Sequence, residues 1–125
     1  MTIEDTTEFK PKFDANGLIP CITTRAGSND IVMFAYMNEE ALNKTIATGE
    51  IYYYSRSRGE LWHKGATSGT VQIVRDIRID CDQDCILISA KIQGSGAGCH
   101  TGRQSCFYRK VEKDSDGKPV LKFIE

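Results

Sequence analysis

Residues 71 to 84 restrict the fold more than any other segment, because apolar and polar side chains alternate along them. Polar residues, three aspartates among them, occupy most of one set of alternate positions, and Val74 is the exception. Successive side chains of a strand point to opposite faces, so the alternation predicts one long strand with a single buried face. The residues expected on that buried face are Val71, Ile73, Ile77, Ile79 and Cys81.

Around this segment the sequence predicts several short strands and one main helix. Asn38 can cap a helix over about residues 38–48, and Gly49 can end it. Leu42 and Ile46, four residues apart, are expected to share one face of that helix. Runs of β-branched and aromatic residues predict strands at residues 18–23, 31–36, 51–55, 86–92, 106–111 and 120–124.

These elements predict a mainly β, or α+β, fold: one small domain of twisted antiparallel strands with a single main helix. A chain of 125 residues suits one such domain, and residues 1–12 are expected to be a flexible arm. The net charge of −1 gives no reason to expect nucleic acid or an acidic membrane as a partner. The N-terminus lacks a signal-peptide pattern, and no apolar run approaches the ~20 residues of a membrane helix. We therefore expect a cytoplasmic protein.

Three aspartates occupy alternate positions at the end of the predicted strand. Asp80, Asp82 and Asp84 would project from one face of an extended chain. Their charges repel one another, and a divalent cation would remove that repulsion while gaining oxygen ligands. We interpret the row as a metal site, with a solvated acidic edge as the alternative. The spacing excludes an EF-hand, because Cys85 stands where that loop needs glycine.

Four of the five cysteines lie between residues 81 and 106. A reducing compartment disfavours a disulfide framework, so metal binding or catalysis is the better explanation of the cluster. Cys81 alternates with the aspartates and is expected to face the other way, toward partners such as Cys99 and Cys106. Three thiolates around zinc leave a fourth position for water, as in catalytic zinc sites.

Two other interpretations of the cysteines stay open. A closed site of four thiols that also uses Cys85 would make the protein a zinc-stabilised binding module without catalytic activity. Some cysteines could instead be small buried residues, which is our interpretation of Cys21 and also suits Cys85.

The two histidines differ in their surroundings. His100 follows Cys99 directly, so it is expected to point away from the same ion and is a candidate general acid or base. The alternative is an ordinary surface or core histidine. His63, beside Trp62, has no comparable support and is expected at most to line a pocket.

Residues 61–70, LWHKGATSGT, are expected to form a loop with two glycines, one lysine and three hydroxyl groups. Small residues let backbone N–H groups approach an anion, and Lys64 adds a positive charge, so phosphate binding is one interpretation. An ordinary polar loop is the other. The order of the residues excludes a P-loop.

Several of these motifs resemble those of the phosphoribosyl-AMP cyclohydrolases, enzymes of histidine biosynthesis. The most specific match is DCDQD at residues 80–84 followed by CHTGRQSCF at residues 99–107. LIP at 18–20, AYMNEEAL at 35–42 and SRSRGELWHKGATSG at 55–69 extend the resemblance over residues 13–111. Ala66 departs from it, because the family usually has glutamate at this position.

The resemblance implies an activity, a quaternary structure and two metals. The family hydrolyses the N1–C6 bond of the adenine ring in phosphoribosyl-AMP, the third step of histidine biosynthesis, to give phosphoribosyl-formimino-AICAR phosphate. It forms an intertwined homodimer with one zinc site per subunit, shared between subunits. The implied ligands are Cys81, Cys99 and Cys106 for zinc and Asp80, Asp82 and Asp84 for magnesium.

Within this resemblance, His100 is expected to move protons during ring opening. Some relatives carry a fused pyrophosphohydrolase domain, and none is expected here because the sequence stops at Glu125. The substrate has two phosphates, and the candidates to bind them are Arg56, Arg58, Lys64, Thr67, Ser68 and Arg103.

Overall fold

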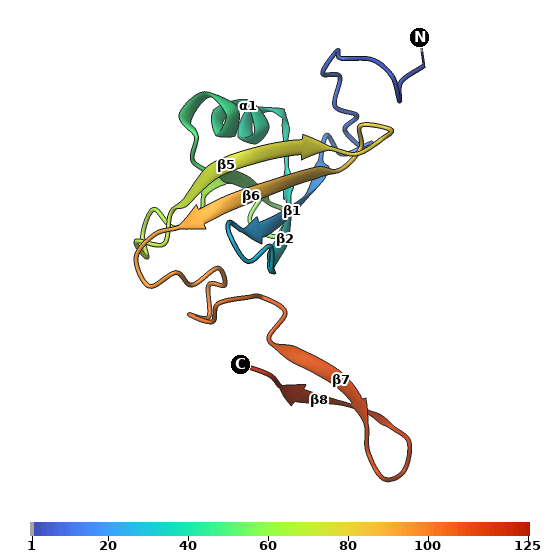
Figure 1. Cartoon of the computed structure of the whole chain (residues 1–125), viewed down its shortest axis with the longest axis vertical. Helices are drawn as coiled ribbons and strands as arrows, with labels where there is room; N and C mark the ends of the chain where they lie inside the picture. Colours follow the sequence, from blue (N-terminus) through green and yellow to red (C-terminus); the bar gives the residue numbers. More distant parts are fainter. Residues whose placement is uncertain (1) are drawn as a thin grey trace.

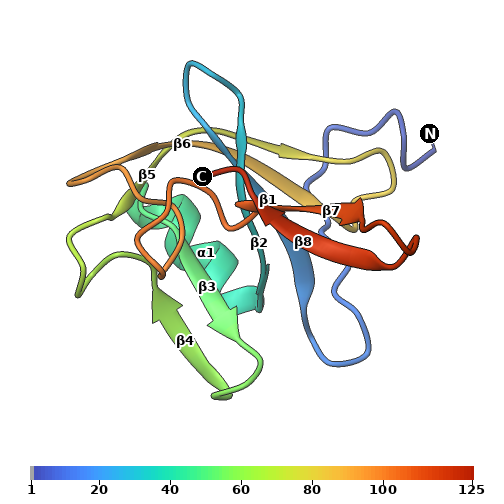
Figure 2. The same cartoon turned by 90° about the horizontal axis from the view of Figure 1, so that it is seen from below.

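Six strands form one curled sheet in the computed structural model, which describes residues 2 to 125 (Figures 1 and 2). The order across this sheet is β4-β3-β2-β1-β6-β5, and β7 pairs with β8 in a separate hairpin. The elements are β1 Ile19–Arg25, β2 Ile31–Met37, α1 Glu39–Thr48, β3 Tyr52–Ser55, β4 Glu60–His63, β5 Gln72–Ile79, β6 Ile86–Ile92, β7 Arg109–Lys113 and β8 Pro119–Phe123.

The predicted fold class, a small α+β domain with mostly strands, is confirmed. One detail differs, because β1 and β6 are parallel whereas the other neighbouring strands are antiparallel. The sheet is therefore mixed. Of the described helices, none is long and apolar enough to span a membrane.

Helix α1 begins and ends where the sequence predicts. The Asn38 side chain accepts a hydrogen bond from the backbone N–H of Ala41 at 2.8 Å, which caps the first turn. Gly49 ends the helix in the left-handed conformation, with φ of 75°. Leu42 is buried in the core, whereas Ile46 is 51% exposed. The helix face that these two residues were expected to share is therefore buried at Leu42 and open to solvent at Ile46.

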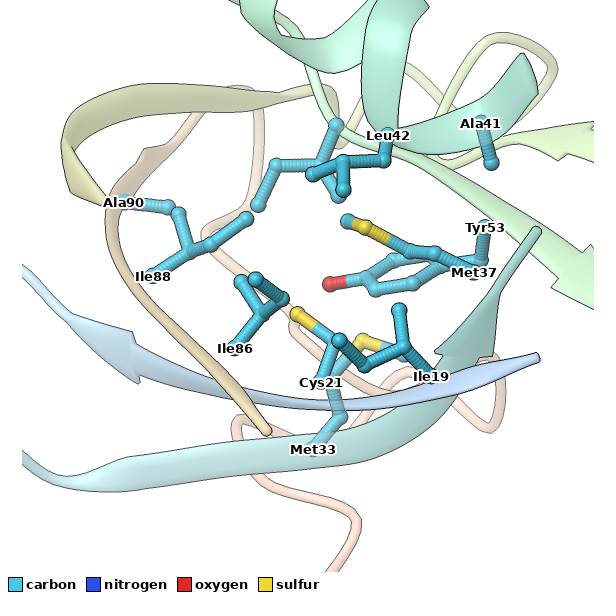
Figure 3. Packing of buried hydrophobic residues seen from close by; sticks show 11 residues of the cluster. Ile19, Cys21, Met33, Met37, Ala41, Leu42, Tyr53, Ile86, Ile88 and Ala90 are labelled. Carbon is cyan, nitrogen blue, oxygen red and sulfur yellow. The ribbon is translucent and has the colours of Figure 1, made fainter. Parts of the chain in front are cut away.

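The core lies between the curled sheet and α1 (Figure 3). Tyr53 is its largest buried side chain, and its hydroxyl group lies 2.6 Å from Thr23 Oγ1 and donates to Gln72 Oε1 at 2.7 Å. Cys21 is fully buried beside this network, and burial raises the pKa of its thiol to about 12. The interpretation of Cys21 as a small buried residue is confirmed.

Strand β5 is shorter and less regular than its sequence pattern predicts. Its pairing with β6 shifts between Val74 and Asp76, which marks a bulge that exchanges the two faces. Val74, Ile77 and Ile79 consequently pack against the core, and Gln72, expected on the polar face, is fully buried. The strand ends at Ile79, so the prediction that it continues through residue 84 is wrong.

Residues 61–70 are not wholly a loop. Strand β4 includes Leu61, Trp62 and His63, which pair with β3, and turns follow. The hairpin of β7 and β8 extends away from the sheet in Figure 1. Its strands begin and end within three residues of the predicted bounds, and it exposes several large apolar side chains, namely Val111, Val120, Leu121 and Phe123.

Candidate functional site

The three aspartates lie in a tight turn between β5 and β6. One carboxylate oxygen from each of the three residues lies within 4.8 Å of the other two, and all three residues are exposed. We refer to Asp80, Asp82 and Asp84 as the aspartate turn. The prediction that these carboxylates lie together is confirmed, whereas the extended backbone on which it relied is wrong.

Hydrogen bonds within the turn hold its shape. Asp80 Oδ1 accepts the backbone N–H groups of Asp84 at 2.9 Å and Cys85 at 3.1 Å. Gln83 has a left-handed backbone, with φ of 61°, and its side chain is bound by a distant segment. The Gln83 amide accepts from the N–H of Lys10 at 2.7 Å and donates to the carbonyl of Glu8 at 3.1 Å. The N-terminal segment thus helps to fix the turn.

Crowding of the carboxyl groups changes their acidity. Hydrogen bonding with the side chains of Asp82 and Asp80 raises the pKa of Asp84 to about 6, and repulsion between the charges adds to this. For Asp80, partial loss of hydration would raise the pKa, but the hydrogen bonds from Asp84 and Cys85 lower it overall. Three carboxylates this close together repel one another, so binding a shared proton or a cation is more favourable for them than keeping all three charges.

The thiols of Cys99 and Cys106 meet at the far end of β6 from the aspartate turn. Loss of hydration would raise the pKa of Cys99, but hydrogen bonds from Thr101 and Cys106 and the charge of Lys64 lower it overall. Thr101 Oγ1 donates to Cys99 Sγ at 3.1 Å. For Cys106, loss of hydration and the neighbouring Cys99 thiol raise the pKa to about 11. Cys99 is therefore expected to ionise at a lower pH than Cys106.

The loop from residue 98 to residue 106, here called the thiol loop, is attached to strand β2. The N–H of Cys106 donates to the carbonyl of Val32 at 2.7 Å, and Ser105 Oγ donates to the carbonyl of Ile31 at 2.8 Å. A Cβ atom on Gly98 would lie 2.9 Å from Cβ of Val32, so only glycine allows this approach. The carboxylate of Glu125 accepts the N–H groups of Gln104 and Ser105.

Cys81 does not join the other two thiols within one chain. It is exposed in the aspartate turn, at the start of β6, whereas the thiol loop follows the end of that strand. Seven strand residues separate these ends by about 20 Å. Over residues 2 to 125, the aspartate turn is the only group of three or more His, Cys, Asp or Glu side chains with ligand atoms within 4.8 Å. Cys85 also lies beside the aspartates, away from the thiol loop.

The two histidines have different surroundings. His100 is exposed in the thiol loop, next to Cys99. His63 Nε2 lies 2.8 Å from Glu50 Oε1, and its ring stacks on Tyr52 with centroids 4.3 Å apart. Sequence reasoning missed this pair, since nothing in the pattern relates Glu50 to His63 before β3 and β4 are paired.

The predicted phosphate-binding residues fall into separate groups. Lys64 and Arg58 lie over the ring of Trp62, at 4.8 Å and 6.0 Å from its centroid. Burial lowers the pKa of Lys64, while the nearby Cys106 and Cys99 oppose that shift. Three more candidates lie elsewhere: Arg56 over the Tyr36 ring, Arg103 over the Tyr108 and Phe123 rings, and Ser68 bonded to Thr70. Thr67 is exposed in the turn after Ala66.

Aromatic residues near these cations were not singled out as site residues from the sequence. Phe34 and Tyr36 come from β2, Trp62 comes from β4, and all three line one groove of about 270 Å³. The alternation of β2 could have indicated them, because Phe34 and Tyr36 lie on the face opposite the buried Met33 and Met37.

Comparison with known proteins gives one consistent family. The family model described as phosphoribosyl-AMP cyclohydrolase matches residues 33–108. The protein of that name from Rhodopseudomonas palustris strain BisB18 is 55% identical over 123 residues, covering 98% of this chain and 83% of the relative. The protein of that name from Bradyrhizobium diazoefficiens is 54% identical over 123 residues, covering 98% of this chain and 86% of the relative.

Proposed function

The chain belongs to the phosphoribosyl-AMP cyclohydrolase family and is a hydrolase of histidine biosynthesis, and from this premise we propose that it opens the N1–C6 bond of the substrate's adenine ring with the help of zinc. The meeting of the Cys99 and Cys106 thiols is the observation that carries this proposal. Membership of an enzyme family removes the alternative of a binding module without catalytic activity.

The donor atoms of the two sites fit two different metals. Thiolates such as those of Cys99 and Cys106 suit zinc, whereas the carboxylates of the aspartate turn suit a hard ion such as magnesium. Zinc supplies a Lewis acid that lowers the pKa of a water molecule when it is bound. We assign the third thiol of that site to Cys81, as the sequence pattern predicts.

A second copy of the chain is the proposed source of Cys81. The distance along β6 keeps Cys81 away from the thiol loop of its own chain. The β7–β8 hairpin supports a homodimer, because it exposes large apolar side chains such as Val111 and Leu121. A two-stranded hairpin is marginally stable alone, so these side chains need a covering surface. An intertwined homodimer would meet both requirements.

His100 is the proposed proton carrier. During ring opening the oxygen of water bonds to C6 and the water loses a proton, the N1–C6 bond breaks, and N1 takes up a proton. The remaining hydroxyl proton is released to solvent, so that C6 becomes the carbonyl carbon of a carboxamide and the positive charge of the substrate is lost. A histidine suits both transfers, since imidazole accepts and donates protons near neutral pH. His100 follows Cys99 in the thiol loop, and its exposed side chain can reach a substrate bound there.

We assign the binding of the substrate's phosphates to positively charged side chains around the Tyr36 and Trp62 rings. Arg56, Arg58 and Lys64 surround the Tyr36 and Trp62 rings. We assign Thr67 and Ser68, in the turn that follows, to the same role, since their hydroxyl groups can donate to phosphate oxygens. Arg103 is the remaining candidate, and its stacking on Tyr108 leaves its N–H groups free to bind an anion at their edge.

One experiment tests the reaction directly. The purified protein is incubated with phosphoribosyl-AMP, with and without Zn²⁺ and Mg²⁺, and the ultraviolet spectrum is followed. We expect the spectrum of the closed purine to disappear when both metals are present and to persist after zinc is removed. Absence of ring opening under every metal condition would overturn the proposed function. Ring opening that persists after complete removal of zinc would overturn the role of that metal.

A further inference from the structure

The rings of Phe34, Tyr36 and Trp62 line one groove, here called the aromatic groove, and the chemistry described above does not use these rings. Tyr54 and Arg56 complete its walls, together with small residues. Its volume of about 270 Å³ lies just below the range of about 300–1,000 Å³ typical of complete small-molecule sites. The groove is therefore suited to one part of a ligand, such as a flat ring, and not to a whole nucleotide.

Strand β2 connects the aromatic groove to the thiol loop. Phe34 and Tyr36 occupy alternate positions of β2 and therefore share one face, and Val32 lies two residues before Phe34, at a bulge in the pairing of β2 with β1. The carbonyl of Val32 accepts a hydrogen bond from the N–H of Cys106, and Phe34 follows two residues, or about 7 Å, further along the strand. Behind the groove wall, Lys64 lies over Trp62 and is also a neighbour of Cys106 and Cys99. A ring in the groove would thus lie on the strand that holds the thiol loop, with Lys64 between the Trp62 ring and the thiols.

The aromatic groove already holds cations against its rings. The Arg56 guanidinium lies 4.1 Å from the centroid of Tyr36, and Lys64 lies 4.8 Å from that of Trp62. Phe34 meets Tyr36 edge to face, with centroids 5.3 Å apart, and is 45% exposed. Aromatic faces attract cations through the quadrupole of the ring, and planar cations also stack on them.

We propose that the aromatic groove binds the purine ring of the substrate and recognises the positive charge that substitution at N1 gives to that ring. This inference rests on the proposed function, because only an N1-substituted purine carries that charge. Phe34, Tyr36 and Trp62 supply the aromatic faces, and Arg56 would leave the Tyr36 ring to pair with a phosphate of the same substrate. The groove thereby selects the N1-substituted nucleotide over AMP, which has the same base and a neutral ring.

Trp62 provides the signal for a binding test, since it is the only tryptophan of the chain. Its fluorescence is followed while the zinc-loaded protein is titrated with 1-methyl-AMP, AMP or N6-methyl-AMP. The first nucleotide has a cationic purine, and the third carries the same added methyl group on a neutral one. We expect all three to quench the emission and 1-methyl-AMP to bind about tenfold more tightly than the other two.

Substitutions in the aromatic groove then show which side chains cause the preference for 1-methyl-AMP. Tyr36→Leu and Phe34→Leu should each reduce the preference for 1-methyl-AMP at least threefold, an effect of the size expected when one cation–π contact is lost. Tyr36→Phe, which keeps an aromatic face, should retain it. Phe9→Leu, an exposed phenylalanine of the N-terminal segment, serves as the control and should change nothing. Thermal melting checks that each variant is folded.

The possible outcomes separate this inference from the proposed function. Equal binding of 1-methyl-AMP and N6-methyl-AMP, or an unchanged preference in Tyr36→Leu, would overturn the inference even if phosphoribosyl-AMP is opened normally. Unresponsive Trp62 emission in a protein that opens the substrate would overturn it as well. A selective groove in a protein that does not open the ring would instead support the inference and contradict the proposed function.

Discussion

The backbone N–H of Cys106 donates a hydrogen bond to the carbonyl oxygen of Val32, with nitrogen and oxygen 2.7 Å apart. This bond joins the thiol loop to the edge of a strand that is 74 residues earlier in the chain. It places the Cys106 backbone beside Val32 of β2, the strand that also carries Phe34 and Tyr36. The position of the thiol loop relative to the sheet is therefore set by strand β2.

The source of the third thiol can be tested by mixing two inactive variants. We expect Cys81→Ser and Cys106→Ser each to abolish ring opening. If Cys81 comes from a second copy, an equal mixture that has exchanged subunits should recover about a quarter of the wild-type activity, because half the dimers are hybrids with one complete site. Mixing Cys99→Ser with Cys106→Ser is the control, since both lesions lie in one thiol loop and no complete site forms. Recovery in the control, or none in the first mixture, would contradict a shared site.

Cys85 should not contribute to zinc binding. Its thiol lies beside the aspartates, and loss of hydration together with their negative charge raises its pKa, which disfavours the thiolate that zinc needs. We expect Cys85→Ser to retain near-normal zinc content by metal analysis, while Cys99→Ser, measured in parallel, loses most of the metal. Large loss of zinc from Cys85→Ser would instead favour the closed four-thiol site.

Replacement of His100 should separate proton transfer from metal binding. We expect His100→Ala to keep its zinc and to lose ring-opening activity by about 10²–10⁴-fold, the usual contribution of a general acid or base. The dependence of the residual activity on pH should also change. His63→Gln is the comparison, because His63 is paired with Glu50 instead of lying in the thiol loop. Unchanged turnover by a zinc-loaded His100→Ala protein would rule out the assigned role.

The aspartate turn should make stability depend on pH and on magnesium. The pKa of Asp84 is raised from 3.8 to about 6 in the folded chain. Its contribution to stability is therefore full below about pH 4 and is lost as the pH rises through about 6. The lowered pKa of Asp80 acts in a lower pH range, because its contribution to stability is lost only as the pH falls below about 4. Without a divalent cation, we expect the melting temperature to decrease as the pH rises from about 4 to about 6.

Magnesium should reverse that loss, because it binds the ionised carboxylates. We expect added Mg²⁺ to raise the melting temperature more at pH 7 than at pH 5. Asp84→Asn should reduce this difference strongly, whereas Asp116→Asn, in the exposed turn of the β7–β8 hairpin, should preserve it. A magnesium response that is the same at both pH values would contradict a cation site in the aspartate turn.

Removal of the Tyr53 hydroxyl should destabilise the core. Tyr53→Phe leaves Thr23 and Gln72 without their shared buried partner, and an unsatisfied buried polar group costs about 1–3 kcal/mol. Denaturant unfolding measures this change in the free energy of unfolding. Tyr54→Phe, at the neighbouring and partly exposed position, should change stability by less than about 0.5 kcal/mol. Equal stabilities of the two variants would show that the network contributes nothing.

Local sequence determined the features that depend on near neighbours. Asn38 and Gly49 set the bounds of α1 because capping uses contacts within one turn of a helix. The three aspartates were expected to lie together because their spacing keeps them close in a strand and in a turn alike. The meeting of Cys99 and Cys106, seven residues apart in one glycine-containing loop, was similarly within reach of sequence reasoning.

Only the tertiary structure decided how those features are oriented and joined. Strand β5 stops at Ile79 and the aspartate turn forms around Gln83, whose amide is held by Glu8 and Lys10 from more than 70 residues away. Gln72 is buried because Tyr53 and Met33 supply partners for its amide. Such contacts are set by the folded sheet and have no signature in an alternating pattern. The same holds for Cys81, which the sequence groups with the other thiols and which β6 separates from them within the chain.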